Sequence, residues 1–229
     1  MVATAILVHG AWHGTWYWSG VRAGLAERGV ASVAVSLPSC GADAGALGGL
    51  AEDAAALRAA IDATEGPLVV VGHSYAGVVV TEAVDDPRVD RLVYLCAFLP
   101  AEGQSLVALL PPGEPPPYVE FRADGIVTFV EPLARDTLYN DCDDAVAEEA
   151  VGRLVLHTAS AVTAPVSRAA WRTIPSTYVV CTHDRTIPPD LQRTMAASAT
   201  DVVEIPTDHS PMLSAPARVA EIVAAAAAR

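Results

Sequence analysis

Short apolar segments alternate with longer segments of helical pattern along most of this chain of 229 residues. Such alternation is typical of βαβ units, in which parallel strands form one sheet and the connecting helices cover both of its faces. The predicted strands are Thr4–His9, Ala31–Ser36, Leu68–Gly72, Arg91–Cys96, Ser176–Cys181 and Asp201–Ile205. The predicted helices are Trp16–Arg28, Leu50–Thr64, Tyr75–Val84, Pro189–Ser198 and Ala215–Ala228. The sequence therefore predicts an α/β fold with a mostly parallel sheet of about six strands flanked by helices.

The alternation breaks once, between the fourth and fifth predicted strands. Prolines gather at residues 111–117 of this interval, and neither a sheet nor a regular helix tolerates them at that density. We expect residues 99–173 to form an inserted lid, or cap, because a connection this long in a compact domain is usually functional. Residues 1–98 and 174–229 would then form the core. A disordered linker is the alternative, and the apolar side chains of the interval disfavour it. These side chains include Phe121, Phe129, Leu133, Leu138 and Tyr139.

Charge and composition exclude several classes of protein. The chain has 27 acidic against 14 basic side chains, a formal net charge of −13, which disfavours nucleic acid and anionic membranes as partners. It contains no lysine, which excludes Schiff-base catalysis and the GxxxxGK phosphate-binding loop. No apolar run reaches about 18 residues, and no cationic leader precedes the first predicted strand. We therefore expect a cytoplasmic protein.

The cysteines predict neither a metal site nor a disulfide framework. Cys40, Cys96, Cys142 and Cys181 are widely spaced and lack the pairing with histidine or cysteine that zinc sites require.

The absence of lysine beside abundant alanine and arginine suggests a bacterial source.

The segment Leu68–Val80 predicts how a reactive serine is presented. A buried strand ends at Gly72 and an apolar helix begins just after Ser74, so the serine lies on a tight strand-to-helix turn. In a Gly-x-Ser-x-Gly nucleophile elbow, small residues let the backbone take this turn and expose the hydroxyl. The fifth position is Ala76 here, which is small enough to keep the turn. An N-cap is the alternative role for Ser74, but the strand–turn–helix context favours a nucleophile.

A serine nucleophile requires a base and a carboxylate that orients the base. His209 follows the last predicted strand, at the same carboxyl edge of the sheet as Ser74, and we predict that it is the base. Asp184 follows the preceding strand at that edge and is the predicted carboxylate. Asp208 is the alternative, although a residue next to the histidine is poorly placed to bind its ring. The alternative role for Asp184 is a turn residue paired with Arg185.

Catalysis by a serine also requires two backbone N–H groups for the oxyanion. Tyr75, the residue after the nucleophile, is the first predicted donor. The second is Ala11, in a loop after the first strand whose glycines, Gly10 and Gly14, allow a close backbone approach.

With these residues in place, the sequence resembles the α/β-hydrolase superfamily. More narrowly, it is similar to the group that contains plant methylesterases, the salicylate-binding esterase and the hydroxynitrile lyases. The resemblance covers nearly the whole chain and rests on His9–Trp18, Val71–Gly77, Leu138–Cys142, Asp184–Pro188 and Asp208–Ser214. It implies an α/β-hydrolase fold with a triad of Ser74, Asp184 and His209. It also implies oxyanion donors at Ala11 and Tyr75, no metal and no organic cofactor.

Within this group, two positions favour ester hydrolysis over cyanohydrin cleavage. The lyases similar to this sequence have a threonine after the first-loop histidine and a lysine after the catalytic histidine. Gly10 and Ser210 occupy these positions here, so the cation thought to stabilise departing cyanide is missing.

The sequence thus predicts a serine hydrolase that cleaves a small carboxylic ester through an acyl-enzyme intermediate. The expected partner is a small apolar ester, with no nucleic acid or membrane, and a homodimer is compatible with the sequence. Three alternatives stay open: a non-hydrolytic protein or receptor that binds a small ligand, an enzyme like the hydroxynitrile lyases, and a natural-product tailoring enzyme. Serine at position 74 argues against dehalogenases and epoxide hydrolases, which use aspartate there.

We expect the substrate pocket to be mainly apolar. Ordinary core packing is the alternative role for each candidate lining residue. The candidates are Trp12, Phe98, Leu99, Phe121, Phe129, Tyr139 and Met212.

Overall fold

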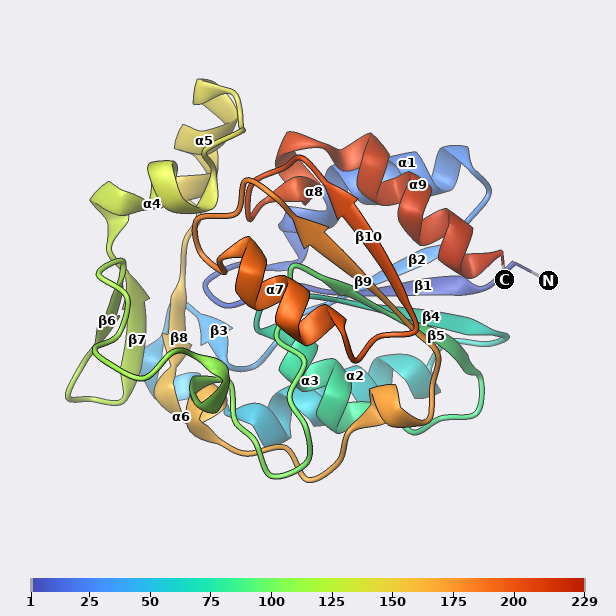
Figure 1. Ribbon diagram of the computed structural model, residues 1–229, viewed down its shortest axis with the longest axis horizontal. Coiled ribbons are helices and arrows are strands. Elements are labelled where there is room, and N and C mark those ends of the chain that lie inside the picture. The colour runs from blue at the N-terminus through green and yellow to red at the C-terminus, as the bar shows by residue number, and fades with distance from the viewer. Residues whose placement is uncertain (1, 229) are drawn as a thin grey trace.

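Six parallel strands form the central sheet of the computed structural model, which describes residues 2–228 (Figure 1). Across the sheet the order is β10 (Asp201–Ile205), β9 (Ser176–Cys181), β5 (Val89–Leu95), β4 (Leu68–His73), β1 (Thr4–Val8) and β2 (Ser32–Val35). Each neighbouring pair is parallel. The predicted six-stranded sheet is therefore confirmed, and each predicted strand begins and ends within two residues of the observed one. The predicted core also includes Met1 and Arg229, which lie outside the described residues.

All the helices predicted between the strands are present. They are α1 (Ser19–Glu27), α2 (Leu50–Asp62), α3 (Ala76–Ala83), α7 (Pro189–Ala196) and α9 (Pro216–Ala227). Shorter helical segments are η1 (Thr15–Trp18), η2 (Ala44–Ala46), η4 (Ala170–Arg172) and α8 (Pro211–Ser214). Figure 1 shows α1 and α9 on one face of the sheet and α2 and α3 on the other. The sheet is thus the middle layer of three.

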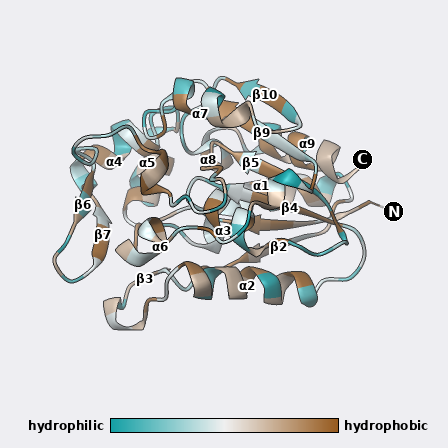
Figure 2. Cartoon of the chain, turned by 60° about the horizontal axis from the view of Figure 1, so that its bottom comes forward, coloured by the Kyte–Doolittle hydropathy of each residue, from teal (hydrophilic) through white to brown (hydrophobic). Residues whose placement is uncertain are grey.

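Successive strand residues are buried in opposite hydrophobic clusters. Ile6 and Val70 pack with the residues of α2 and α3, whereas Leu7 and Val71 pack with those of α1 and α9. Side chains alternate between the faces of a strand, so strands covered on both sides are apolar throughout. Figure 2 shows this apolar character along the strands at the centre of the molecule.

Residues 107–163 lie toward the carboxyl ends of the central strands and contribute to a second, antiparallel sheet, whereas residues 164–173 run back along α3 to the start of β9 (Figure 1). The order of the second sheet is β3 (Cys40–Gly41), β8 (Leu156–Thr158), β7 (Ile126–Phe129) and β6 (Val119–Phe121). Helical segments accompany it: η3 (Val107–Leu109), α4 (Glu131–Leu138), α5 (Asp144–Val151) and α6 (Ala159–Thr163). These strands are too short to show periodicity, which is why the sequence did not predict them. Strand β3 comes from the segment assigned to the core, so the second sheet joins both parts of the chain.

The cap packs into the same two clusters as the core. Phe129 and Leu138 are buried with the residues of α1 and α9, whereas Val127 and Val162 are buried with those of α2 and α3. A disordered linker at this position is therefore excluded. Within residues 2–228, the helices all fall short of the length and apolar character needed to cross a bilayer.

Helix α3 runs very close to the loop after β5. A Cβ atom built on Gly77 would lie 2.1 Å from the carbonyl oxygen of Phe98, closer than any real Cβ contact. The position that must stay free of a side chain is thus Gly77, one residue after the fifth position of the predicted elbow.

Gly77→Ala is expected to lower the free energy of unfolding by about 1–3 kcal/mol or more, because helix and loop must separate to admit the methyl group. Gly152→Ala is the matched control, since its Cβ would meet its nearest neighbours at an ordinary 3.6 Å. Urea denaturation of both variants checks this expectation. Equal free energies for the two would contradict the close packing described here.

Candidate active site

Ser74 occupies the turn between β4 and α3 in a strained backbone conformation. Its φ of 54° falls in the left-handed region, which residues other than glycine rarely adopt. The Ser74 N–H donates to the Leu95 carbonyl (3.3 Å), and the Ser74 carbonyl accepts from the Phe98 N–H (3.1 Å). The N-cap of α3 is Tyr75, so the alternative of Ser74 as an N-cap residue is wrong. The turn instead places Ser74 in the wall of a cavity.

His209 links Ser74 to Asp184. Its Nε2 lies 2.9 Å from Ser74 Oγ, and its Nδ1 lies 2.6 Å from Asp184 Oδ2. Because an ionised carboxylate can only accept, Nδ1 carries the proton and Nε2 accepts from the serine hydroxyl. The side chains of His209 and Asp184 are both buried. Three loops at the carboxyl ends of β4, β9 and β10 thus bring the three predicted residues into one hydrogen-bonded line.

Four donors surround the Asp184 carboxylate. Oδ1 accepts from the backbone N–H groups of Thr186 (2.7 Å) and Ile187 (2.8 Å), and Oδ2 accepts from Gln192 Nε2 (2.8 Å) as well as from His209. These donors compensate the cost of burying a charge. The alternative pairing of Asp184 with Arg185 is not formed, because the Arg185 guanidinium donates to the Asp136 carbonyl. Sequence reasoning missed Gln192, since a lone polar residue on a helix gives no sign that it is buried.

Asp208 has a different role from the one considered as an alternative to Asp184. Its carboxylate accepts from the N–H groups of Asp141 (3.0 Å) and Ser210 (3.0 Å) and from Ser214 Oγ (2.7 Å). Burial raises the pKa of Asp208. The side chain thus points away from the His209 ring and ties the loop that carries His209 to the cap.

The other buried histidines are fixed by hydrogen bonds or by packing. The Nδ1–H of His13 donates to the Ala11 carbonyl (2.7 Å), and its Nε2 accepts from the Tyr139 hydroxyl (2.8 Å). His9 accepts from the Leu37 N–H (3.2 Å). Burial lowers the pKa of His13 to about 3 and that of His9 to about 4. Both rings are therefore neutral at pH 7, in the tautomers that their partners require.

His73 and His157 are also buried. His73 Nε2 lies 2.8 Å from the carbonyl oxygen of His209, to which it donates, so the side chain points away from Ser74. The His157 ring packs against Tyr75 (4.6 Å between centroids), and neither of its nitrogens has a hydrogen-bond partner among the described residues. Burial lowers the pKa of His157 to about 3 and that of His73 well below its usual value.

Among residues 2–228, the set of side chains close enough together to ligate a metal ion is His73, Cys96 and His209. Their ligand atoms lie within 4.8 Å of one another. All three side chains already form hydrogen bonds within the protein. Cys96 Sγ (3.7 Å) and His73 Nε2 both donate to the His209 carbonyl, and the His209 ring binds Asp184 and Ser74. We therefore attribute the cluster to the support of the His209 loop.

The first loop of the chain touches the elbow directly. A Cβ atom on Gly10 would lie 2.9 Å from Ser74 Cβ and 2.8 Å from His73 Nδ1, so only glycine allows this approach. The next residue, Ala11, lines the cavity beside Ser74 and Tyr75. The two predicted oxyanion donors are thus brought to the same cavity as the serine.

A buried carboxylate that sequence reasoning missed holds the Tyr75 side chain. The Tyr75 hydroxyl donates to Asp53 Oδ2 (2.6 Å), and Asp53 Oδ1 accepts from the Ser39 N–H (2.8 Å). Burial raises the pKa of Asp53. Asp53 on α2 therefore connects the residue after the nucleophile to the loop that leads into β3.

A cavity of about 70 Å³ lies over Ser74, between the core and the cap. Its walls are almost entirely apolar, as expected. Three of the candidate pocket residues, Trp12, Phe98 and Phe121, line it. The lining residues that the sequence gave no signal for are Leu106, Val107, Leu110, Pro116, Tyr118, Val119, Val127, Val162, Thr186 and Ile187.

The other four candidate pocket residues lie elsewhere. Leu99 and Met212 are buried in the two hydrophobic clusters. The Phe129 ring packs edge-on behind Trp12 (5.2 Å), and Tyr139 binds His13. Their type and position in the chain suited a pocket, but packing turned each side chain toward the interior, so the expectation is corrected for these four.

Comparison with known proteins supports this architecture. A family model described as "Alpha/beta hydrolase family" matches residues 5–222. The chain belongs to the alpha/beta hydrolase family. It is 34% identical to the alpha/beta hydrolase nvfD of Aspergillus novofumigatus (strain IBT 16806), over 97% of this chain and 95% of that protein. It is also 25% identical to methylesterase 7 of Arabidopsis thaliana, over 92% and 91% of the two chains. The family resemblance seen in the sequence is thereby confirmed.

Solved structures show the same fold. A pyrethroid hydrolase from Sphingobium faniae JZ-2 superposes with a TM-score of 0.87 at 23% sequence identity, covering 100% of this chain and 98% of that one. At this identity the likeness establishes the alpha/beta hydrolase fold.

The buried histidines are expected to make stability depend on pH. Their pKa values in the folded state lie below the usual 6.5, so the unfolded chain binds more protons as the pH falls below about 6.5. Each histidine then contributes a loss of about 2 kcal/mol of unfolding free energy between pH 7 and pH 5.

His157→Phe tests this contribution, because phenylalanine keeps the packing against Tyr75 and does not titrate. Between pH 7 and pH 5, the free energy of unfolding of the variant is expected to fall by about 2 kcal/mol less than that of the wild type. Urea denaturation at both pH values measures the difference. An identical pH dependence in the two proteins would contradict the low pKa of His157.

Proposed function

We propose that this protein is a serine esterase that cleaves a small, apolar carboxylic ester through an acyl-enzyme intermediate. The observation that carries the proposal is the hydrogen-bonded line from Asp184 through His209 to Ser74, which ends in the wall of an apolar cavity. A serine hydroxyl is a weak nucleophile unless a base accepts its proton. A buried Ser–His–Asp line that opens into a cavity is the arrangement that acyl transfer requires.

In the first half of the reaction, Ser74 Oγ forms a bond to the ester carbonyl carbon as its proton passes to His209 Nε2. The tetrahedral intermediate then collapses, its bond to the alcohol oxygen breaks, and His209 returns the proton to the leaving alcohol. In the second half, His209 takes a proton from water, the hydroxide attacks the acyl carbon, and Ser74 leaves with the proton. Asp184 holds the His209 tautomer and stabilises the imidazolium.

The oxyanion is assigned to the backbone N–H groups of Ala11 and Tyr75. Support for this assignment is the contact of the Gly10 backbone with Ser74, which leaves Ala11 next to the nucleophile. Such donors act strongly in a site that excludes water, and the apolar cavity provides one. The bond from Tyr75 to Asp53 holds one of the two donor residues in place.

The relatives support an esterase over the alternatives. One of them is named a methylesterase and a structural neighbour is named a pyrethroid hydrolase, so hydrolysis is common to both names. The residue after His209 also favours an esterase over a hydroxynitrile lyase. Ser210 stands there, where the similar lyases have lysine. The Ser210 hydroxyl accepts a hydrogen bond from Tyr17 (2.5 Å).

The proposal predicts that short-chain aryl and methyl esters are hydrolysed by the wild type and not by Ser74→Ala, with a burst of alcohol release at early times. Asp184→Asn is expected to lower kcat by about 10³–10⁴-fold, because it removes the acceptor that fixes the His209 tautomer. Stopped-flow and steady-state assays measure both effects. Equal hydrolysis by Ser74→Ala and the wild type would overturn the proposal.

Asp190→Asn is the matched control for Asp184→Asn. It makes the same exchange on α7, at a side chain that is 96% exposed. Its turnover is expected to equal that of the wild type. Circular dichroism of all variants separates lost chemistry from lost folding, and an Asp184→Asn protein that is folded and fully active would move the carboxylate role to another residue.

A further inference from the structure

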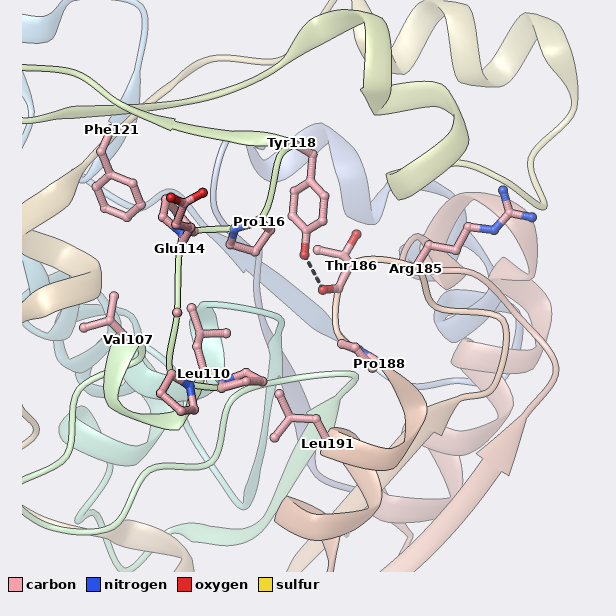
Figure 3. Close-up of a pocket in the computed structure, with 14 residues that line it drawn as sticks. Val107, Leu110, Glu114, Pro116, Tyr118, Phe121, Arg185, Thr186, Pro188 and Leu191 are labelled. Carbon is pink, nitrogen blue, oxygen red and sulfur yellow. Dashed lines mark hydrogen bonds between the residues drawn. The ribbon is translucent and has the colours of Figure 1, made fainter.

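An open groove of about 740 Å³ lies outside the cavity over Ser74 (Figure 3). Six residues line both spaces: Val107, Leu110, Pro116, Tyr118, Phe121 and Thr186. The cavity and the groove therefore lie on either side of a common wall. The groove is thus a neighbouring space for an ester that is too large for the cavity over Ser74.

The two spaces admit groups of very different size. One water molecule needs about 10–15 Å³ of such volume, so the cavity of about 70 Å³ holds only a few non-hydrogen atoms. Pockets for drug-sized ligands measure about 300–1,000 Å³, a range that includes the groove of about 740 Å³ but not the cavity. A ring system thus has room in the groove alone.

The groove is lined mostly by rigid, apolar residues. Its prolines are Pro111, Pro112, Pro115, Pro116 and Pro188. Proline has no backbone N–H and a fixed φ, so these five residues donate no backbone hydrogen bonds and lose little entropy when a ligand binds. Phe121 is an aromatic residue that is 45% exposed, and exposed apolar surface of this kind marks binding sites.

Charged groups are few among the described residues of the groove. They are Glu114 and Arg185. The Arg185 guanidinium donates to the backbone carbonyl of Asp136 (3.1 Å), and Figure 3 shows its side chain extending away from the groove. The groove therefore favours an apolar group over an anionic one.

Tyr118 is fixed in the common wall. Its hydroxyl donates to the carbonyl oxygen of Thr186 (2.6 Å), as the dashed line in Figure 3 shows, and its ring stacks on Phe129 (5.3 Å between centroids). The first of these contacts joins the cap to the loop that carries Asp184. Contacts with the core at Thr186 and with the cap at Phe129 thus hold Tyr118 between the cavity and the groove.

We propose that the groove binds the bulky apolar arm of an ester whose small arm fills the cavity over Ser74. The inference rests on the proposed esterase function and defines its substrate class. The class is carboxylic esters that join a group of a few non-hydrogen atoms to an apolar ring system, and Tyr118 separates the two arms.

The test compares kcat/KM for three esters: ethyl acetate, which has two small arms, and 2-naphthyl acetate and methyl 2-naphthoate, which each have one bulky arm. Leu191→Asp places a charge in the groove without touching the cavity, since Leu191 lines the groove alone. Relative to ethyl acetate, at least one naphthyl ester is expected to lose tenfold or more in kcat/KM, mainly through KM. Ratios between variant and wild type cancel the intrinsic reactivity of each ester.

Leu133→Asp is the matched control, since it makes the same exchange at an exposed leucine of α4 (39% exposed). It is expected to leave the ratios between esters unchanged. Pro112→Asp, at an exposed residue of the groove, repeats the test with a second variant in case Leu191→Asp does not fold.

The outcomes separate this inference from the proposed function. If a folded groove variant slows all three esters equally, or none of them, the groove is not the binding site and the esterase proposal stands. If the wild type hydrolyses none of the esters, or Ser74→Ala hydrolyses them equally well, the esterase proposal fails and the inference fails with it. Selective loss of a naphthyl ester supports both.

Discussion

The buried carboxylate of Asp184 is the constraint on which the arrangement of the site depends. A charge taken out of water is costly unless donors surround it, and four donors do so here. They come from the loop after β9, from Gln192 on α7 and from His209 after β10, so satisfying one carboxylate fixes three segments relative to one another. The same bonds leave His209 Nε2 facing Ser74, because the opposite ring nitrogen is held.

The cap gives the site its shape and is itself anchored near the chemistry. Asp208 binds the N–H of Asp141 beside His209, and Tyr118 binds the carbonyl of Thr186, two residues after Asp184. These two hydrogen bonds, together with others such as the one from Arg185 to the Asp136 carbonyl, join the cap to the active-site loops. The wall that divides the small cavity from the large groove runs through the hydrogen bond of Tyr118, so specificity and catalytic geometry share a structural support.

Sequence reasoning succeeded where local pattern and chemistry agree. The strand that ends at Gly72 and the helix after Ser74 specify the elbow, and the parallel sheet brings Asp184 and His209 to its carboxyl edge. It failed for four of the seven pocket candidates because the direction in which a side chain points depends on neighbours distant in sequence. Phe121 lines the cavity whereas Phe129, only eight positions later, packs behind Trp12.

The sequence by itself determined an α/β fold with a mostly parallel sheet, the order of its strands and helices along the chain, and the three residues of the candidate triad. These follow from periodicity and turn chemistry, which act over a few residues. Only the tertiary structure decided that β3 joins the cap sheet, that Gln192 and Asp53 support the site, and that a cavity and a groove meet at Tyr118. Each of these depends on contacts between distant segments, and no local pattern encodes which buried partners will meet.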